Sequence, residues 1–401
     1  LNSPKLLKEH EEIIQGTFRT RFPPEPNGHL HLGHAKAMYL DFEGVAGFNS
    51  WTSWECYLRY DDTNPETETE EFAASILEDV LWMKFAPCKI TYSSDYFDQL
   101  YEFAKILIKK GKAYVCFQTE EEIRASREKL KKGEIEESPW RNTDPELNLA
   151  LFREMKAGKQ RGEVPATLRL KIDLTSFNPC MWDPVAYRTV GKWDPETKTR
   201  SLPPHFRTGT SWFIYPMYDF THCIVDSLEQ IDISLCTLEF EVRRDLYFWI
   251  LNELELWRPE VWEIGRLNIK GHTLSKRKLK TLVAEGKVDG WDDPRLLTLK
   301  GIRKRGIPAS VVHAFVSSLG LSRADSEISL GTFLSYALKE FNESLPRTLV
   351  VKDPLEVEIL NWKTDFWVTL PFFPSNFRSL RTIFSKTLYL EQTDFRTEED
   401  P

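Results

Sequence analysis

The first 110 residues alternate between short strand-like and longer helix-like segments, and this alternation most restricts how the chain can fold. Short runs rich in aromatic and β-branched residues predict strands at 17–22, 56–60 and 89–93. Stretches with apolar residues at helical spacing predict helices at 34–46, 65–81 and 94–111. Repeated strand–helix units of this kind predict an α/β fold with a parallel sheet and right-handed crossovers.

The pattern changes after this first part of the chain. Residues 119–163 are dense in charge and include two helix-like stretches, and 164–172 returns to strand. Residues 191–204 are predicted to form a surface loop or hairpin, and strand–helix alternation resumes near 212. The order predicts an insertion within the α/β domain. The chain is then predicted to be helical over about 280–342 and β from Pro346 onward.

Composition excludes some classes of protein. The formal net charge of −8 argues against a simple polycation that binds nucleic acid, although binding responds to a local basic face. No apolar run approaches the roughly 18 residues that a membrane span requires. The six cysteines contain no C-x-x-C pair, so we predict free thiols in a reducing compartment and no metal held by the protein. We find no signal peptide, although the sequence starts at Leu1.

A stiff turn leads from the first strand into the first predicted helix. It reads "FPPEPNGHLHLGH" over 22–34 and ends in two histidines, His31 and His34, on either side of Gly33. The amino terminus of a helix offers free N–H groups and partial positive charge, which suits a phosphate. Two imidazoles at this spacing can donate to phosphate oxygens in a transition state. Taken alone, a proline-rich turn with incidental surface histidines explains the pattern as well.

Three further segments are candidates for binding. "TLSKRKLK" at 273–280 offers Ser275 and Lys276 to phosphates, or is a solvated basic loop. "KGIRKRG" at 300–306 could contact phosphates, or is an exposed charged face. In "LRYDDTNP", Asp61 is expected at the ligand-binding edge of the sheet, whereas Asp62 is expected to cap a helix that begins at Asn64–Pro65.

Taken together, these segments resemble the class I aminoacyl-tRNA synthetases of the glutamyl/glutaminyl subgroup. "RFPPEPNGHLHLGHAKA" matches the extended HIGH motif of the subgroup, and "LSKRK" stands where the family has its KMSKS motif. "YLRYDDTNPE", "YPMYDFTH", "SLCTLEF", "GRLN" and "GWDDPRL" are further signature blocks. The resemblance extends over residues 3–398 and is highly specific when the motifs are taken jointly.

Within the subgroup, "SLCTLEF" resembles the glutaminyl branch of eukaryotic type. Glutamyl enzymes typically carry an arginine where this chain has Cys236. A cation there would pair with the carboxylate of a glutamate side chain. A neutral thiol leaves no counter-charge, so a neutral amide can enter and the charged analogue is disfavoured by its desolvation cost.

The resemblance implies roles for individual residues. His31, His34 and Lys276 are the implied catalytic residues. The implied ATP-binding set is Glu25, Asn27, His31, Gly33, His34, Arg266, Leu267, Ser275 and Lys276. The implied glutamine-binding set is Arg21, Asp61, Tyr218 and Cys236. One position departs from the family, because Val261 stands where members usually carry a glutamine that supports the substrate amide.

The resemblance also implies a division into domains. A Rossmann-type catalytic domain would occupy 1–93 and 206–280, the second half including the KMSKS-type loop, with an inserted α/β domain that binds the tRNA acceptor stem at 94–205. A helical subdomain would follow at 281–343, and the start of an anticodon-binding β-barrel, left incomplete, at 344–401.

The function implied is ATP-dependent ligation of glutamine to tRNA(Gln) in the cytoplasm, with Mg²⁺ accompanying ATP and no permanent cofactor. L-glutamine, ATP and tRNA(Gln) are the expected partners, with a multi-synthetase complex as a further expectation and no membrane. Alternatives that the residues leave open are a glutamyl-tRNA synthetase, a tRNA-binding paralogue without catalysis, and a small-molecule nucleotidyltransferase that shares H-x-G-H.

Overall fold

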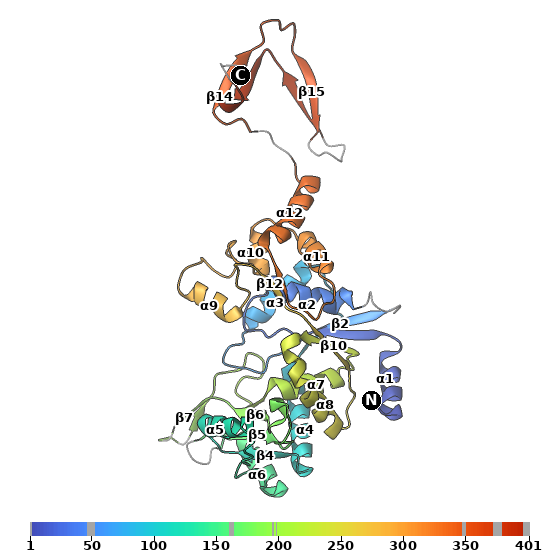
Figure 1. Ribbon diagram of the computed structural model, residues 1–401, viewed down its shortest axis with the longest axis vertical. Coiled ribbons are helices and arrows are strands. Elements are labelled where there is room, and N and C mark those ends of the chain that lie inside the picture. The colour runs from blue at the N-terminus through green and yellow to red at the C-terminus, as the bar shows by residue number, and fades with distance from the viewer. Residues whose placement is uncertain are drawn as a thin grey trace. The chain divides into compact units, whose positions relative to one another are not determined.

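The protein is described here from a computed structural model that covers residues 2–45, 53–159, 164–194, 196–197, 199–346, 350–371 and 379–395. The chain divides into two compact units, Leu1–Ile328 and Ser329–Pro401, which are described separately. Figure 1 traces both units from the amino terminus in blue to the carboxyl terminus in red. No helix in the described part is long and apolar enough to cross a membrane.

Two groups of parallel strands form the centre of the first unit. The first group is β1 (Phe18–Phe22), β2 (Trp54–Tyr60) and β3 (Lys89–Tyr92), and the second is β10 (Ile233–Thr237) and β11 (Glu260–Ile264). The backbone N–H of Asp232 donates to the carbonyl of Arg19 at 2.9 Å, so β10 lies beside β1. The predicted parallel α/β sheet is therefore confirmed, and the strands expected at 17–22, 56–60 and 89–93 are all present.

Helices cover these strands because each buries one apolar stripe. Those around the parallel strands are α1 (Pro4–Ile14), α2 (Leu32–Tyr39), α3 (Glu70–Trp82), α4 (Phe97–Lys109), α7 (Tyr218–Leu228) and α8 (Arg244–Glu253). Short helices of other types adjoin them: η1 (Leu40–Gly44), η3 (Ser93–Tyr96) and η5 (Leu238–Arg243). One cluster of the core joins Phe18 of β1 with Ile233 of β10 and Ile264 of β11, and Leu40 of η1 packs in the same cluster. Figure 1 shows α7 and α8 beside β10.

An antiparallel sheet interrupts the alternation. Its strands, in spatial order, are β4 (Ala113–Cys116), β5 (Thr167–Leu170), β6 (Val185–Thr189) and β9 (Ile214–Pro216). The same region holds α5 (Glu120–Lys131), α6 (Pro145–Lys156), η4 (Pro179–Met181), and the hairpin of β7 (Lys192–Asp194) and β8 (Thr199–Ser201). Every residue of α5 is at least partly exposed, whereas α6 buries Leu149, Phe152 and Met155. The charge-dense helices and the hairpin are thus found where the sequence predicts them.

The last third of the chain is helical and then β, as the sequence predicts. The first unit ends with β12 (Leu267–Ile269), α9 (Lys276–Ala284), α10 (Leu299–Lys304), α11 (Ala309–Ser318) and β13 (Ser326–Ile328). The second unit contains α12 (Leu330–Ser344), β14 (Pro354–Glu358), β15 (Phe366–Pro371), β16 (Ser379–Phe384), β17 (Thr387–Glu391) and η6 (Gln392–Asp394). Its strands pair as two antiparallel ladders, β14 with β17 and β15 with β16.

Two local predictions are wrong. The helix expected to begin at Asn64–Pro65 begins instead at Glu70, because the Thr69 hydroxyl accepts the N–H of Phe72 and caps the helix there. Asp62 therefore does not cap that helix. Its carboxylate accepts the backbone N–H of Ser94 at 2.8 Å and the Ser94 hydroxyl at 2.6 Å, which ties the end of β2 to the start of η3.

Candidate functional site

The turn after β1 presents a pair of histidine rings at the start of α2. The backbone N–H of Gly33 donates to Nδ1 of His31, and the backbone N–H of His31 donates to Nδ1 of His34, both at 3.1 Å. Because each Nδ1 accepts a hydrogen bond, each neutral ring carries its hydrogen on Nε2. A Cβ at Gly33 would lie 3.0 Å from the His31 ring, so glycine permits this close cap.

Both rings are held neutral. Burial, followed by the nearby charge of Lys276, lowers the pKa of His31 to about 3. Burial lowers the pKa of His34 well below its usual range, and His31 and Lys276 add to that effect. Near neutral pH, the pair is therefore a set of two uncharged N–H donors that need no proton from solvent.

Lys276 joins this turn from 249 residues away in the sequence. It is the first residue of α9, and its Nζ donates to Oδ1 of Asn27 at 2.9 Å and to the carbonyl of Glu25 at 3.2 Å. Burial lowers the pKa of Lys276, whereas the charge of Glu25 opposes that shift. The two motifs that the sequence places at opposite ends of the α/β domain are thus in contact.

A cavity of about 610 Å³ opens beside the histidine pair. Six residues of the predicted ATP set line it: His31, Gly33, His34, Arg266, Leu267 and Ser275. Glu25, Asn27 and Lys276, the rest of that set, lie next to it through the contacts of Lys276. The size and the polar lining suit a nucleotide.

Several residues that shape this cavity were not predicted. Glu239 lines it and pairs with Arg266. Lys36 is buried, and its Nζ donates to the carbonyl of Gly265 at 2.7 Å. A Cβ at Gly265 would lie 2.0 Å from the carbonyl oxygen of Ala324, so only glycine fits there. "TLEF" and "GRLN" contain Glu239 and Gly265, but their local pattern does not indicate which distant groups they meet.

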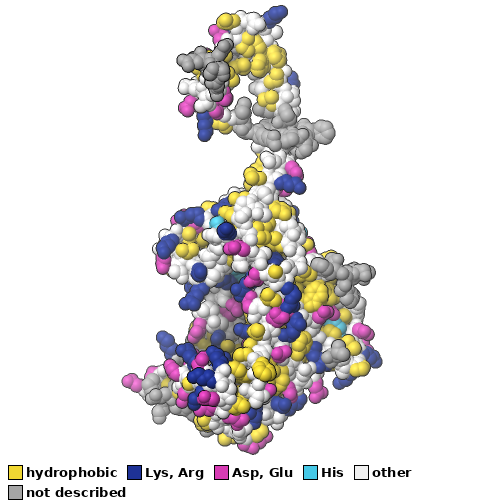
Figure 2. All heavy atoms as spheres, in the orientation of Figure 1, with side chains coloured by type: hydrophobic (Ala, Val, Ile, Leu, Met, Phe, Trp, Pro, Cys, Tyr) yellow, Lys and Arg dark blue, Asp and Glu magenta, His cyan; other side chains and the backbone are white. Residues whose placement is uncertain are grey.

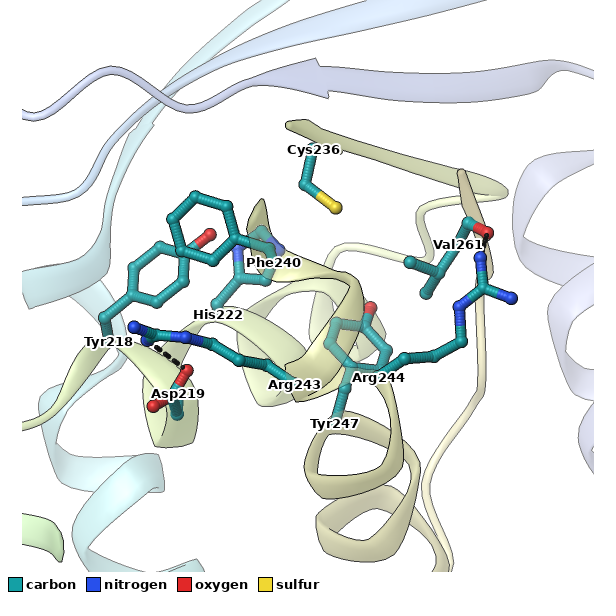
Figure 3. Close-up of a pocket in the computed structure, with 9 residues that line it drawn as sticks. All are labelled: Tyr218, Asp219, His222, Cys236, Phe240, Arg243, Arg244, Tyr247 and Val261. Atoms are coloured by element: carbon teal, nitrogen blue, oxygen red, sulfur yellow. Dashed lines mark hydrogen bonds and ion pairs between the residues drawn. The ribbon is translucent and has the colours of Figure 1, made fainter. Parts of the chain in front are cut away.

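A second, narrower pocket lies beside β10 and β11. Tyr218, Cys236 and Val261 line it, together with His222, Phe240 and Tyr247 (Figure 3). The Tyr218 ring stacks on His222 with centroids 4.9 Å apart, and these two rings lie on the opposite side of the pocket from Val261. The structure therefore brings together two residues of the predicted glutamine set with the valine that departs from the family.

Three titratable side chains that line this pocket are uncharged, whereas Asp219, Arg243 and Arg244, which also line it, carry charges. Burial raises the pKa of the Cys236 thiol to about 12 and lowers the pKa of His222 to about 3. Burial also raises the pKa of Tyr218 above its usual range. The thiol, the imidazole and the phenol are consequently all neutral near pH 7.

Arg21 lies next to this pocket, in contact with His222, and belongs to a buried ionic network. Its side chain is fully buried and donates to Oδ1 of Asp226 at 2.9 Å, to the carbonyl of Leu235 at 2.9 Å and to the hydroxyl of Ser234 at 2.6 Å. Arg59 donates to the same Asp226 carboxylate. The predicted contact between Arg21 and the amino acid stays a prediction, since its guanidinium already binds protein groups on several sides.

Asp61 lies at the end of β2, at the edge where parallel sheets bind ligands. It is buried, and the hydroxyl of Ser93 donates to its Oδ1 at 3.2 Å. Burial, with a smaller contribution from the charge of Glu25, raises the pKa of Asp61 to about 6. The role predicted for Asp61 in binding an α-amino group stays a prediction.

The basic segment at 300–306 is largely paired with carboxylates. Lys300 and Arg303 bind Glu78 at 3.2 and 2.8 Å, and Lys304 binds Asp292 at 2.7 Å. These pairs favour the interpretation of residues 300–306 as an exposed charged face over their interpretation as a phosphate-binding segment. Among the residues that the structure describes, no group of three His, Cys, Asp or Glu side chains could hold a metal ion.

The comparisons with known proteins agree with this geometry. Residues 17–342 match the family model of the class I (E and Q) tRNA synthetase catalytic domain, and 345–400 match the anti-codon binding domain of the same family. The chain is 46% identical to a glutamine–tRNA ligase of Saccharomyces cerevisiae, over 99% of the chain and 48% of the relative. It is 46% identical to a cytoplasmic glutamine–tRNA ligase of Arabidopsis thaliana and 42% identical to a glutamine–tRNA ligase of Rattus norvegicus, with the same coverages.

The chain spans about half the length of these curated relatives. A solved glutamate–tRNA synthetase of Elizabethkingia anophelis shares the fold at a TM-score of 0.53 and 18% identity, over 80% of this chain and 70% of that chain. The motifs, the contact between Lys276 and the 25–28 turn, and the extent of the family match lead to one conclusion. The chain belongs to the family of class I tRNA synthetases for glutamate and glutamine.

Proposed function

We propose that the chain ligates glutamine to tRNA(Gln) in two steps. In the first step, an oxygen of the glutamine carboxylate bonds to the α-phosphorus of ATP, and the bond from that phosphorus to pyrophosphate breaks. In the second step, the 2′-hydroxyl of the terminal adenosine of the tRNA attacks the acyl carbon, and AMP leaves. The names of the relatives in yeast, plants and mammals support glutamine as the amino acid.

The observation that carries this proposal is that the same two strands, β10 and β11, line both the narrow pocket and the larger cavity. Cys236 of β10 and Val261 of β11 line the narrow pocket, whereas Thr237 and Ile264, at the ends of these strands, line the larger cavity. An amino acid and a nucleotide bound in these two places would meet at the strand ends. Holding two reactants in a fixed geometry supplies a large part of the rate enhancement in such reactions.

The phosphate side of the reaction is assigned to the histidine pair and Lys276. His31 and His34 offer uncharged Nε2–H donors to the α-phosphate, where negative charge increases in the transition state. Lys276 would leave its contacts at Asn27 and Glu25 for the departing pyrophosphate. Arg266 and Leu267, with Gly33 and Ser275, would hold the remainder of ATP. Mg²⁺ bound to ATP would neutralise phosphate charge, and phosphates would be its main ligands.

The amino-acid side is assigned to the narrow pocket and Asp61. Tyr218 and Cys236 would surround the side-chain amide, and Asp61 would bind the α-ammonium group. Val261 cannot donate a hydrogen bond from its side chain, so the amide would be recognised from the tyrosine side of the pocket. Arg21, which lies next to the pocket, would attract the α-carboxylate of the amino acid through its positive charge.

Asp61 yields a pH-dependent prediction. Its pKa is raised to about 6, so the carboxylate that binds an ammonium group is lost as pH falls through that value. We expect kcat/KM for the amino acid to decrease as pH falls below about 6 in wild type. In Asp61→Asn, which keeps the hydrogen bond from Ser93, this decrease should be absent. Pyrophosphate exchange measured from pH 5 to 8 tests this. An unchanged acid limb in Asp61→Asn would assign that limb to another group.

The remaining assignments concern tRNA. Residues 94–205 would bind the acceptor stem, residues 281–343 would form the helical subdomain, and residues 344–401 would belong to an anticodon-binding β-barrel. Figure 2 shows Lys and Arg side chains on both sides of a hollow in the first unit, near α9 and the α5–β7 region. This surface is suited to an RNA backbone despite the overall charge of −8. A cytoplasmic location and a multi-synthetase complex belong to the same proposal.

The test is pyrophosphate exchange and tRNA charging with glutamine and with glutamate, with tRNA added or withheld. We expect exchange and charging with glutamine. A preference for glutamate would instead make the chain a glutamyl-tRNA synthetase, and binding of tRNA without exchange would make it a non-catalytic paralogue. Exchange that never leads to tRNA charging would favour a small-molecule nucleotidyltransferase.

A further inference from the structure

Two arginines that are consecutive in the sequence line the narrow pocket. Arg243 ends η5 and lies beside Tyr218 and Asp219, whereas Arg244 begins α8 and reaches Val261 (Figure 3). Arginine binds carboxylates through two parallel hydrogen bonds. A pocket with two arginines would ordinarily select an anionic ligand such as the glutamate side chain. Which ligand the pocket accepts therefore depends on whether these two positive charges are neutralised by the protein.

Each guanidinium is already bound by a carboxylate of the protein. Arg243 donates from Nη1 to Oδ1 of Asp219 at 2.8 Å. Arg244 donates from Nε to Oε1 of Glu263 at 2.9 Å and from Nη2 to Oε2 of the same residue. Nη2 of Arg244 also donates to the carbonyl of Val261 at 2.9 Å, on the pocket wall. The pocket therefore carries two ion pairs and no free cation among its described lining residues.

The two pairs differ in how far water screens them. The Asp219 side chain is 28% exposed, whereas that of Glu263 is 0% exposed. Glu263 is also bound by Arg323 at 3.2 Å, and Arg323 does not line the narrow pocket. Removing one partner of a pair that includes a buried carboxylate leaves an uncompensated charge close to the ligand. Loss of the more exposed Asp219 would be partly offset by solvent.

We propose that Glu263 determines the amino-acid specificity of this pocket by holding Arg244 in an ion pair, so that the pocket accepts a neutral amide and disfavours a carboxylate. The inference rests on the proposed function, because it concerns the pocket assigned there to the glutamine side chain. Glu263 acts through Arg244 and contacts no substrate itself, so it is a positioning residue. Glutamine and glutamate are nearly isosteric, and the charge of the wall is then what separates them.

The test variant is Glu263→Gln, which keeps the shape of the side chain and removes its charge. Freed from the pair, Arg244 can donate two hydrogen bonds to a ligand carboxylate. We expect the ratio of kcat/KM for glutamate to that for glutamine to rise about ten- to a hundred-fold. Dissociation constants of the two amino acids, measured on the full chain, should shift in the same direction.

Two further variants separate charge from structural damage. The double variant Arg244→Gln with Glu263→Gln is neutral again, and its ratio should return to within about threefold of wild type. Glu241→Gln removes the same charge from the exposed pair with Arg323 outside the pocket, and should change the ratio less than about twofold. If Glu263→Gln does not fold, Arg244→Gln alone leaves a net negative wall and should lower the ratio about tenfold.

Each outcome decides the matter. A folded Glu263→Gln protein that keeps the wild-type ratio overturns the inference and leaves the proposed function intact. A shift of equal size in the double variant also overturns it, because charge would not be the cause. If wild type activates neither amino acid, the proposed function fails, and the two dissociation constants still test the inference. A wild-type preference for glutamate overturns both.

Discussion

Replacing His34 by asparagine is expected to lower kcat/KM for pyrophosphate exchange about 10²- to 10³-fold while leaving the stability of the fold nearly unchanged. In wild type, Nδ1 of His34 accepts the backbone N–H of His31, and Nε2 carries the hydrogen available to a phosphate. The asparagine side chain can place its oxygen near the position of Nδ1. It cannot reach the position of Nε2, so it keeps the cap and removes the donor.

His34→Ala provides the matched comparison. It removes the donor and the cap together, so its activity should fall by a similar factor while its free energy of unfolding drops by a further ~1 kcal/mol. Pyrophosphate exchange and urea unfolding of the three proteins separate the two effects. Activity of His34→Asn within about threefold of wild type would show that Nε2 does not act on the phosphate, and that the pair serves only to start α2.

The two neutral imidazoles also limit how this site can respond to pH. Because burial keeps both pKa values far below 7, the donors are unchanged from pH 5 to 9. Any acid limb in activity over that range must arise elsewhere, and Asp61, with its pKa near 6, is the group placed to produce it. The phosphate and amino-acid sides of the site should therefore be separable by pH.

Features with a local pattern could be predicted from the sequence. The turn that presents His31 and His34 is continuous in the chain, and the strands and helices around it follow from apolar periodicity. Lys276 could be assigned because "LSKRK" is a recognisable segment, although the contact between its Nζ and Asn27 spans 249 positions. The parallel sheet and the β-rich carboxyl part followed from the same patterns.

Features set by distant partners could not be predicted. Asp62 was expected to cap a nearby helix, but Ser94 from the next strand–helix connection provides two hydrogen bonds that a local pattern cannot reveal. The pairing of Arg244 with Glu263 has the same origin, since a surface-like "RR" and a strand glutamate meet only when α8 packs against β11. Charge signs visible in a sequence therefore do not give the charge of a pocket.

The Asp226 carboxylate is the clearest case of a residue whose importance appears only in the folded protein, and its loss is expected to have the largest effect on stability. It accepts Arg21 from β1 at 2.9 Å, Ser234 at 2.8 Å and the hydroxyl of Tyr247 at 2.9 Å, and it also binds Arg59 from β2. It thereby joins α7 to both groups of parallel strands with an entirely buried charge.

Asp226→Asn should reduce the free energy of unfolding by about 3–5 kcal/mol, because two buried guanidinium groups then share one neutral amide oxygen. The direction in which this stabilisation changes with pH follows from the pKa of the Asp226 carboxyl in the folded protein. Burial alone would raise its pKa, but Arg21 and Arg59 outweigh that effect and hold the pKa below its usual range. The stabilisation is therefore fully present above the unfolded pKa of about 3.9 and is lost only as pH falls below it.

Urea unfolding of the wild-type and Asp226→Asn proteins should thus show a constant difference in stability from pH 8 to 5, which decreases only in stronger acid. Glu78→Gln supplies the matched control, since Glu78 also binds two cations, Lys300 and Arg303, but at the surface with 52% of its side chain exposed. That variant should lose no more than about 1 kcal/mol. If both variants lost the same small amount, the buried network would contribute no more than a surface pair. The junction between α7 and the parallel strands would then depend on apolar packing alone.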